Sequence, residues 1–297
     1  MSVDFSLLSK PNMVEEIDFE SLLIERKSAL IALFDSEQQA TITAVLDRES
    51  EPLTKFLQES CYREIILRKR INEAALSTLL AFATGTDLDA VVANYGIKRL
   101  LVNAATADTS AVYETDDALR YRASLVFDSL SVAGPTSAYE YHALSADGRV
   151  ADAKASSPAP AEALVTILQR DTETGTATDA LLQVVQNYLN DDVRRPVADR
   201  LTVQSVSVVP FELVATIYTN NLPESDSLLT AAKTAVQSYL DESRRIGRSI
   251  YLSKIYNLLH VSGVVHVVID SPKMDIDVSA VQVAHCTNIT LNTGDAS

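Results

Sequence analysis

No glycine or proline interrupts this chain between Pro52 and Gly85, and that run constrains the fold more than any other feature of the sequence. Proline is tolerated at the first position of a helix, because the amide it lacks would have no partner there. Apolar and small residues then recur at three- and four-residue steps, which places them on one helix face. They are Leu53, Phe56, Leu57, Leu67, Ile71, Ala74, Thr78, Leu79 and Phe82. A helix of about thirty residues would be roughly 45 Å long.

A rod of that length is too long for the rest of one chain to cover, so part of its apolar face is expected to bind another protein. The residues predicted to make this contact are Leu53, Leu57, Leu67, Ile71 and Leu79. Residues 19–34 show the same helical spacing. Gly85 is expected to end the long helix as a left-handed cap, and Gly96 to end a short helix over residues 87–95. A further helix is expected to open at Thr115.

The second half of the chain contains an internal repeat. Residues 185–189 and 236–240 share the pattern Val-Gln-x-Tyr-Leu, and each copy precedes an arginine pair, Arg194-Arg195 or Arg244-Arg245. Each copy also follows a strand-like run. Alternating or continuous apolar runs predict strands at residues 149–155, 163–169, 201–209, 211–218 and 264–269. These elements favour two βαβ-like units, with an antiparallel sheet covered by helices on one face.

The fold class predicted from these patterns is α+β. A long-helix region at the N-terminus is followed by small α/β domains, and the C-terminal part consists of the two βαβ-like units. The predicted domains are residues 1–100 (helical and partner-binding), 101–160 (middle α/β) and 161–297 (tandem βαβ-like). Pro158 and Pro160 mark the second boundary, because each removes an amide donor and stiffens the chain.

The charge balance limits the possible partners. The net charge is −15, with twelve acidic and five basic side chains in residues 1–60. Nucleic acid is not expected as a partner, because phosphate contacts need clustered Lys and Arg. The acidic excess suits either a solubilising surface or attraction of a basic partner. No apolar run reaches the ~18 residues of a membrane span, and the first residues lack the pattern of a signal peptide.

A search for chemistry finds no phosphate-binding loop, zinc-protease motif or nucleophile elbow. Cys61 and Cys286 fit no zinc spacing. Asp275-Ile276-Asp277 resembles the start of a calcium loop but lacks the glycine and distal glutamate of that loop. His285 and Cys286 are adjacent, and adjacent residues of a strand point to opposite faces. No catalytic residue, metal or cofactor is therefore predicted. The arginine pairs could clamp carboxylates, but they are expected rather at helix C-termini or at a subunit interface.

Several segments resemble the baseplate assembly protein J family of contractile-tailed temperate phages and R-type bacteriocins. They are Ala-Thr-Gly-Thr-Asp-Leu-Asp-Ala at 83–90, followed by Tyr95-Gly96 and Arg99, and Glu-Thr-Asp-Asp-Ala-Leu-Arg-Tyr-Arg at 114–122. Leu-Ser-Val-Ala-Gly-Pro at 130–135, Ala-Tyr-Glu-Tyr-His at 138–142, Ala-Asp-Gly-Arg-Val at 146–150 and Arg-Pro-Val-Ala-Asp-Arg-Leu-Thr-Val at 195–203 extend the resemblance. It covers nearly the whole chain.

The resemblance implies a structural role in a virion or tailocin baseplate that is assembled in the bacterial host cytoplasm. Family members resemble the T-even phage wedge protein, which occurs twice in each wedge and joins the wedges into a ring around the hub. The implied partners are an I-family wedge protein, a lysozyme-like W-type sheath initiator, a second copy of the chain, and copies in adjacent wedges. No small-molecule substrate and no membrane are implied, and the family demands no catalytic residues.

Two other classes of function compete with this interpretation. Paired βαβ units often bind small effectors at their interface, which would suit a cytoplasmic small-molecule-binding regulatory protein. A soluble enzyme of unrecognised type is the third possibility. Size under native conditions separates these hypotheses, since a wedge protein co-purifies with other tail proteins. The sequence does not separate an infectious phage from a phage-tail-like bacteriocin.

Overall fold

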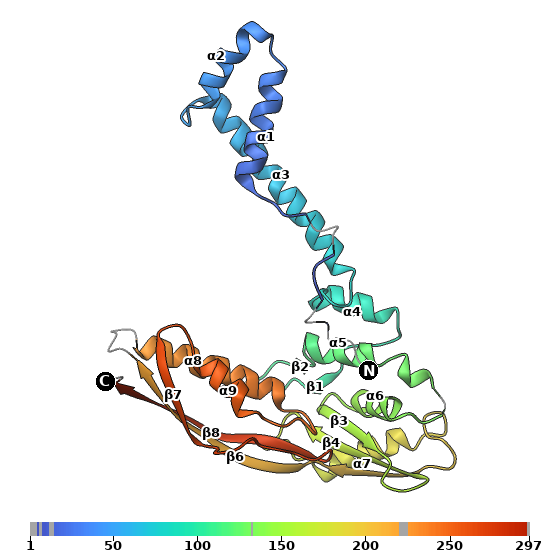
Figure 1. Ribbon diagram of the computed structural model, residues 1–297. Coiled ribbons are helices and arrows are strands. Elements are labelled where there is room, and N and C mark those ends of the chain that lie inside the picture. Colours follow the sequence, from blue (N-terminus) through green and yellow to red (C-terminus); the bar gives the residue numbers. More distant parts are fainter. Residues whose placement is uncertain (1–4, 6–7, 12–14, 132, 220–224, 296–297) are drawn as a thin grey trace. The chain divides into compact units, whose positions relative to one another are not determined.

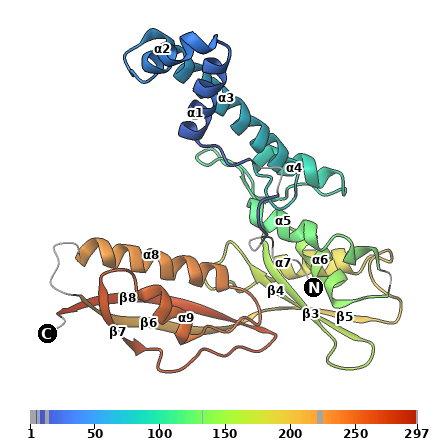
Figure 2. The ribbon, with the colours of Figure 1, turned by 45° about the horizontal axis from the view of Figure 1, so that its top comes forward.

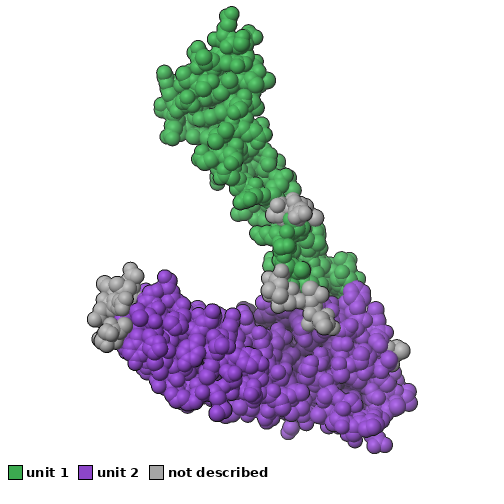
Figure 3. Space-filling model, viewed as in Figure 1, with its two compact units in different colours: residues 1–98 green, residues 99–297 purple. Residues whose placement is uncertain are grey.

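The computed structural model describes residues 5, 8–11, 15–131, 133–219 and 225–295. The chain forms two compact units, residues 1–98 and 99–297, shown in different colours in Figure 3. The predicted boundary after residue 100 lies two residues beyond this division. The predicted boundary after residue 160 falls in a loop between two paired strands. The three-part division of the chain stays a prediction.

The first unit is helical. Its elements are α1 (Phe19–Ala32), α2 (Ser36–Leu46), α3 (Pro52–Ser77) and α4 (Gly85–Ala93). The Asp18 carboxylate accepts the Ser21 amide at 2.8 Å and so caps the start of α1. Leu22 and Leu23 of α1 pack against Cys61 in the first half of α3, and α1 lies beside that half in Figures 1 and 2.

The long helix is shorter than predicted. It has 26 residues and ends at Ser77, not near Thr84. The hydroxyls of Ser77 and Thr78 donate to the carbonyls of Ala74 and Ala75 at 3.0 and 2.9 Å, and such side-chain bonds compete with helix continuation. Gly85 does take a left-handed conformation, with φ +54°, but it lies at the start of α4.

The second unit begins with the middle lobe, which we define as residues 99–205. Its helices are α5 (Asp116–Ser124), the short 3-10 helix η2 (Asp128–Leu130), α6 (Thr136–Ala146) and α7 (Asp179–Leu189). Its strands are β1 (Leu101–Asn103), β2 (Val112–Tyr113), β3 (Val150–Ser156), β4 (Glu162–Gln169) and β5 (Arg200–Ser205). The Thr115 hydroxyl accepts the Ala118 amide, so Thr115 caps α5 as expected.

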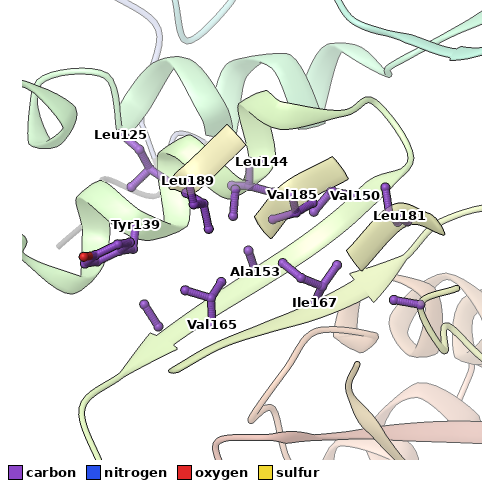
Figure 4. Packing of buried hydrophobic residues seen from close by; sticks show 13 residues of the cluster. Leu125, Tyr139, Leu144, Val150, Ala153, Val165, Ile167, Leu181, Val185 and Leu189 are labelled. Carbon is purple, nitrogen blue, oxygen red and sulfur yellow. The ribbon is translucent and has the colours of Figure 1, made fainter. Parts of the chain in front are cut away.

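The core of the middle lobe lies between its helices and one face of the sheet β3-β4-β5. Val165 and Ile167 alternate along β4 and point to the same face. Figure 4 shows them below Leu181 and Val185 of α7, while Tyr139 of α6 packs into the same cluster. Helices α6 and α7 therefore cover a single face.

The C-terminal lobe, defined as residues 206–295, repeats this construction. It contains β6 (Ser207–Thr219), α8 (Ser225–Ser243), α9 (Leu252–Leu259), β7 (Val264–Ser271) and β8 (Gln282–Asp295), with sheet order β7-β6-β8. Leu213 and Ile217 of β6 pack beneath Val236 of α8 and Ile255 of α9, and all four are essentially fully buried. The two Val-Gln-x-Tyr-Leu copies thus lie in corresponding helices, α7 and α8.

The α+β class and the one-sided helical cover are confirmed, but the predicted antiparallel sheet is wrong. In each lobe the central strand has one antiparallel and one parallel neighbour: β4 pairs antiparallel with β3 and parallel with β5, and β6 pairs antiparallel with β7 and parallel with β8. The crossover through α7 returns the chain in the same direction, which makes β4 and β5 parallel. Strand β8 was not among the predicted sheet strands, although His285 and Cys286 within it were treated as strand residues.

An apolar seam joins the two lobes. Leu168 of β4 packs with Val206, Ile246 and Val283. Beside it, the buried Asp152 carboxylate of β3 accepts the Ile246 amide at 2.9 Å. Burial raises the pKa of Asp152 above its usual value. The seam and this hydrogen bond hold the segment that follows α8 against the middle lobe.

Candidate partner-binding surface

Helix α3 has a buried face and an exposed apolar face. On the buried face, Cys61 is 1% exposed and packs with Leu22 and Leu23 of α1, and Leu57 and Ile65 border the same cluster. These α3 residues are spaced four apart, about one helical turn. This side of α3 is therefore core of the first unit.

Five large apolar side chains of α3 are exposed; Tyr62 and Ile66 point to other sides, and the remaining three share one face. Phe56, Leu67 and Ile71 are 67%, 59% and 58% exposed. Eleven residues make about three helical turns and four make about one, so these side chains point to the same side of α3. We call them the exposed stripe. Isolated exposed apolar residues are ordinary on protein surfaces, but an aligned set on one helix is typical of an interaction surface.

The five residues predicted to bind a partner do not all lie on this stripe. Leu67 and Ile71 belong to it, one turn apart. Leu57 borders the internal core, and Leu53 and Leu79 are half-buried. The sequence pattern could not divide the apolar face, because one helical spacing serves contact within the chain and contact outside it.

Ion pairs fix the rotation of α3 about its own axis. Glu64 accepts hydrogen bonds from Arg26 of α1 and from Arg68 at 2.7 Å. These bonds, from Arg68 first and then Arg26, lower the pKa of Glu64. Glu15 also pairs with Arg68 at 3.1 Å and exchanges two hydrogen bonds with Asn72. Since these contacts hold the polar flank of α3 against the N-terminal segment and α1, the exposed stripe keeps its outward direction.

The segment Glu-Thr-Asp-Asp-Ala-Leu-Arg-Tyr-Arg, quoted above for the resemblance, has a structural task in the second unit. Glu114 forms a buried ion pair with Arg122 and accepts the Leu100 amide at 3.0 Å. Arg99 donates to the Glu114 carbonyl at 2.8 Å and pairs with Asp116 at 2.7 Å. The segment thus ties the start of the second unit to α5. Sequence reasoning missed this pairing, because eight-residue spacing between acid and base carries no recognisable pattern.

The cysteine, aspartate and arginine side chains considered as candidates for catalysis or metal binding serve in packing and in helix capping. Burial raises the pKa of both thiols, Cys61 and Cys286, which opposes the thiolate form that a nucleophile or metal ligand needs. Asp275 accepts the Leu252 amide at 2.8 Å at the start of α9. Arg194 donates to the Tyr188 carbonyl near the end of α7, as the helix-terminus interpretation expects.

Two absences hold for the described parts of the chain. No cluster of three or more His, Cys, Asp or Glu side chains is placed to hold a metal ion within the described ranges. No helix that the structure describes has the length and apolar character needed to cross a membrane.

Comparison with known proteins agrees with the resemblance. Residues 49–106 match the Baseplate J-like N-terminal domain, residues 131–205 the Baseplate J-like central domain, and residues 214–292 the Baseplate J-like protein C-terminal domain. Baseplate protein J of Escherichia phage P2 is 45% identical over 296 residues, covering 98% of each chain. The architecture and these matches define a structural component of a phage baseplate. The chain belongs to the baseplate J family.

Membership of this family establishes a structural role in the phage particle, in contact with other baseplate proteins. The family match to the N-terminal domain begins at residue 49 and includes all of α3. The exposed stripe therefore lies within the matched region.

Proposed function

We propose that this chain is a wedge component of a contractile-tail baseplate, present in two copies per wedge, which links wedges into a ring around the hub. It has no catalytic activity and works without a cofactor or metal. It binds an I-family wedge protein through α3 and lies beside a W-type sheath initiator, a second copy of itself and copies in adjacent wedges. Assembly takes place in the bacterial host cytoplasm, for a phage or for a phage-tail-like bacteriocin.

The exposed stripe is the observation that carries the partner-binding part of this proposal. Its three side chains are aligned on one side of α3, while ion pairs hold the neighbouring flank, about a quarter-turn round the helix, against α1 and the N-terminal segment. When a partner buries an apolar face that the chain leaves uncovered, the complex is stabilised by about 25 cal/mol per Å² of buried apolar surface. The predicted contact residues Leu53, Leu57 and Leu79, which are half-buried, would border that contact.

Co-expression of the chain with the I-family protein of the same particle tests the proposal. Leu67→Asp and Ile71→Asp would each place an unpaired charge in the contact, at a cost of several kcal/mol if the contact excludes water. Both side chains are exposed in the isolated chain, so the variants should fold normally. We expect each variant to lose the partner in a pull-down from the co-expressing cells.

Ile66→Asp is the matched control. Ile66 is 52% exposed, receives the same substitution, and points about 100° away from Leu67 around α3. It should keep the partner. If Leu67→Asp, Ile71→Asp and Ile66→Asp all bind as the wild type does, the exposed stripe is not the binding surface.

A further inference from the structure

A cleft lies between the middle and C-terminal lobes, within the second unit. Its volume is about 280 Å³, just below the 300–1,000 Å³ usual for small-molecule pockets. Both lobes contribute arginines: Arg170 directly follows β4, and Arg244 and Arg245 follow α8. We call these three residues the arginine cluster. The cleft is thus small, and cationic side chains of both lobes line it.

The arginine cluster forms no direct ion pair among the described residues. Carboxylates do lie close enough to act on its charge, Glu114 on Arg170 and the buried Asp152 on Arg245. Arg244 donates through Nη2 to the carbonyls of Thr172 and Glu173, and the Arg245 guanidinium carbon lies 4.9 Å from the centre of the Tyr121 ring. Carbonyls and a ring face orient these groups but do not neutralise their charge.

Buried donors of the cluster remain without an acceptor. The Nε atoms of Arg170 and Arg244 are buried and have no hydrogen-bond acceptor among the described residues. Burial lowers the pKa of Arg170, the nearby Glu114 carboxylate opposes this shift, and the charge of Arg245 adds to it. Guanidinium groups stay charged in proteins, so the cleft holds like charges that repel each other at close range.

The carboxylates of the cleft are mostly engaged elsewhere. Glu114 pairs with Arg122, and Asp117 pairs with Arg120. Asp241 accepts the Gln237 side-chain amide at 2.9 Å on the exposed surface of α8. Outside the lining of the cleft, the buried Asp152 accepts the Ile246 amide, and burial favours its neutral form. The Gln237 amide is neutral and leaves Asp241 charged. Asp241 and the exposed Glu242 at the end of α8 are therefore the two acids of the lining that form no ion pair among the described residues, against three arginines of the cluster.

We propose that this cleft binds a small oxyanion, a phosphate ion or a carboxylate group, between Arg170 and Arg244-Arg245. Planar guanidinium groups match the oxygen geometry of both anions and can donate two hydrogen bonds to each. Because the arginines come from different lobes, the bound anion would bridge them and reinforce the seam around Ile246. The two sources of this chemistry are free phosphate and the acidic side chain of a docked protein.

Isothermal titration calorimetry of the full-length chain tests the site. Sodium phosphate and sodium acetate are titrated separately at constant ionic strength, since phosphate also stabilises proteins by general exclusion from their surface. Saturable one-site binding of either probe is expected. Binding of phosphate alone indicates the free ion, and binding of acetate alone or of both indicates a site that accepts a carboxylate. If neither probe binds, the proposal is wrong.

Variants locate the binding. Arg170→Gln and Arg244→Gln should each raise the Kd of the bound probe roughly tenfold or more, because each removes a charged bidentate donor. Arg200→Gln is the matched control: it removes the same charge from an exposed arginine of β5 outside the cleft, and should leave the Kd unchanged. If all three variants bind the probe with the wild-type Kd, the anion binds elsewhere and the proposal is contradicted.

A measurement on the wild type covers the case in which the variants fail to fold. Hydrogen exchange should slow in residues 170–175 and 241–248 when the bound probe is added, because the anion links these segments. Exchange in residues 101–113, which do not carry the arginine cluster, should not change. Unchanged exchange in both arginine-bearing segments at saturating probe would overturn the assignment.

Discussion

The Glu114–Arg122 ion pair offers a sharp test of how the second unit is held together. Its two side chains are 5% and 4% exposed, and Glu114 also accepts the Leu100 amide. Glu114→Ala would leave the buried Arg122 guanidinium without this carboxylate. Removing one partner of a buried ion pair costs about 3–5 kcal/mol, because the remaining charge loses its compensation while it stays away from water.

This free energy translates into a large thermal shift. For a unit of about 200 residues, 1 kcal/mol lowers the melting midpoint by about 2–4 °C, so Glu114→Ala should lower it by roughly 6–20 °C. Differential scanning calorimetry of the full-length chain measures the shift. The data are fitted with a separate unfolding transition for each of the two compact units. Replacing both partners by apolar residues, Glu114→Leu with Arg122→Met, should recover much of the loss.

Asp117→Ala is the control for this prediction. Asp117 pairs with Arg120 at 2.7 Å in the same helix, but its side chain is 92% exposed. Exposed pairs contribute about 0–1 kcal/mol, so the midpoint should change little. The reasoning is refuted if Glu114→Ala lowers the midpoint no more than Asp117→Ala does.

Two further perturbations probe each unit separately. Gly148→Ala should destabilise the second unit, because the added Cβ would lie 2.3 Å from the Leu101 carbonyl oxygen; a melting midpoint equal to that of the wild type would contradict this close approach. In the first unit, Arg68 and Arg26 lower the folded-state pKa of Glu64. The stabilisation is therefore complete above the unfolded pKa of about 4.5 and is lost as the pH falls through the lower folded value. The free energy of unfolding of the first unit, followed by its helical signal, should fall between pH 6 and pH 3, and this fall should be smaller in Glu64→Gln. An equal fall in Glu64→Gln would show that Glu64 is not responsible.

The helices were predictable wherever one local rule sufficed. Spacing placed α1 and the start of α3, a threonine cap placed the start of α5, and Gly96 ended the helix before it. The end of α3 was not predictable in this way, since the hydroxyl bonds of Ser77 and Thr78 that end it compete with a favourable apolar pattern.

Strand direction and the cleft depend on contacts distant in the sequence. The parallel pairing of β6 with β8 joins segments about 75 residues apart, and no local pattern encodes direction. Arg170 and Arg244 are equally far apart, and the lobe seam brings them to one cleft. The repeat drew attention to Arg244-Arg245, but nothing in the sequence paired them with Arg170.

The family resemblance supplied the structural role, and the exposed stripe of α3 is the contact surface that we propose for it. Electron cryomicroscopy of the assembled baseplate tests both directly. The account predicts this chain in the baseplate, with Phe56, Leu67 and Ile71 covered by an apolar surface of a different protein chain. A baseplate in which these three side chains face solvent, or particles that lack the chain, would contradict it.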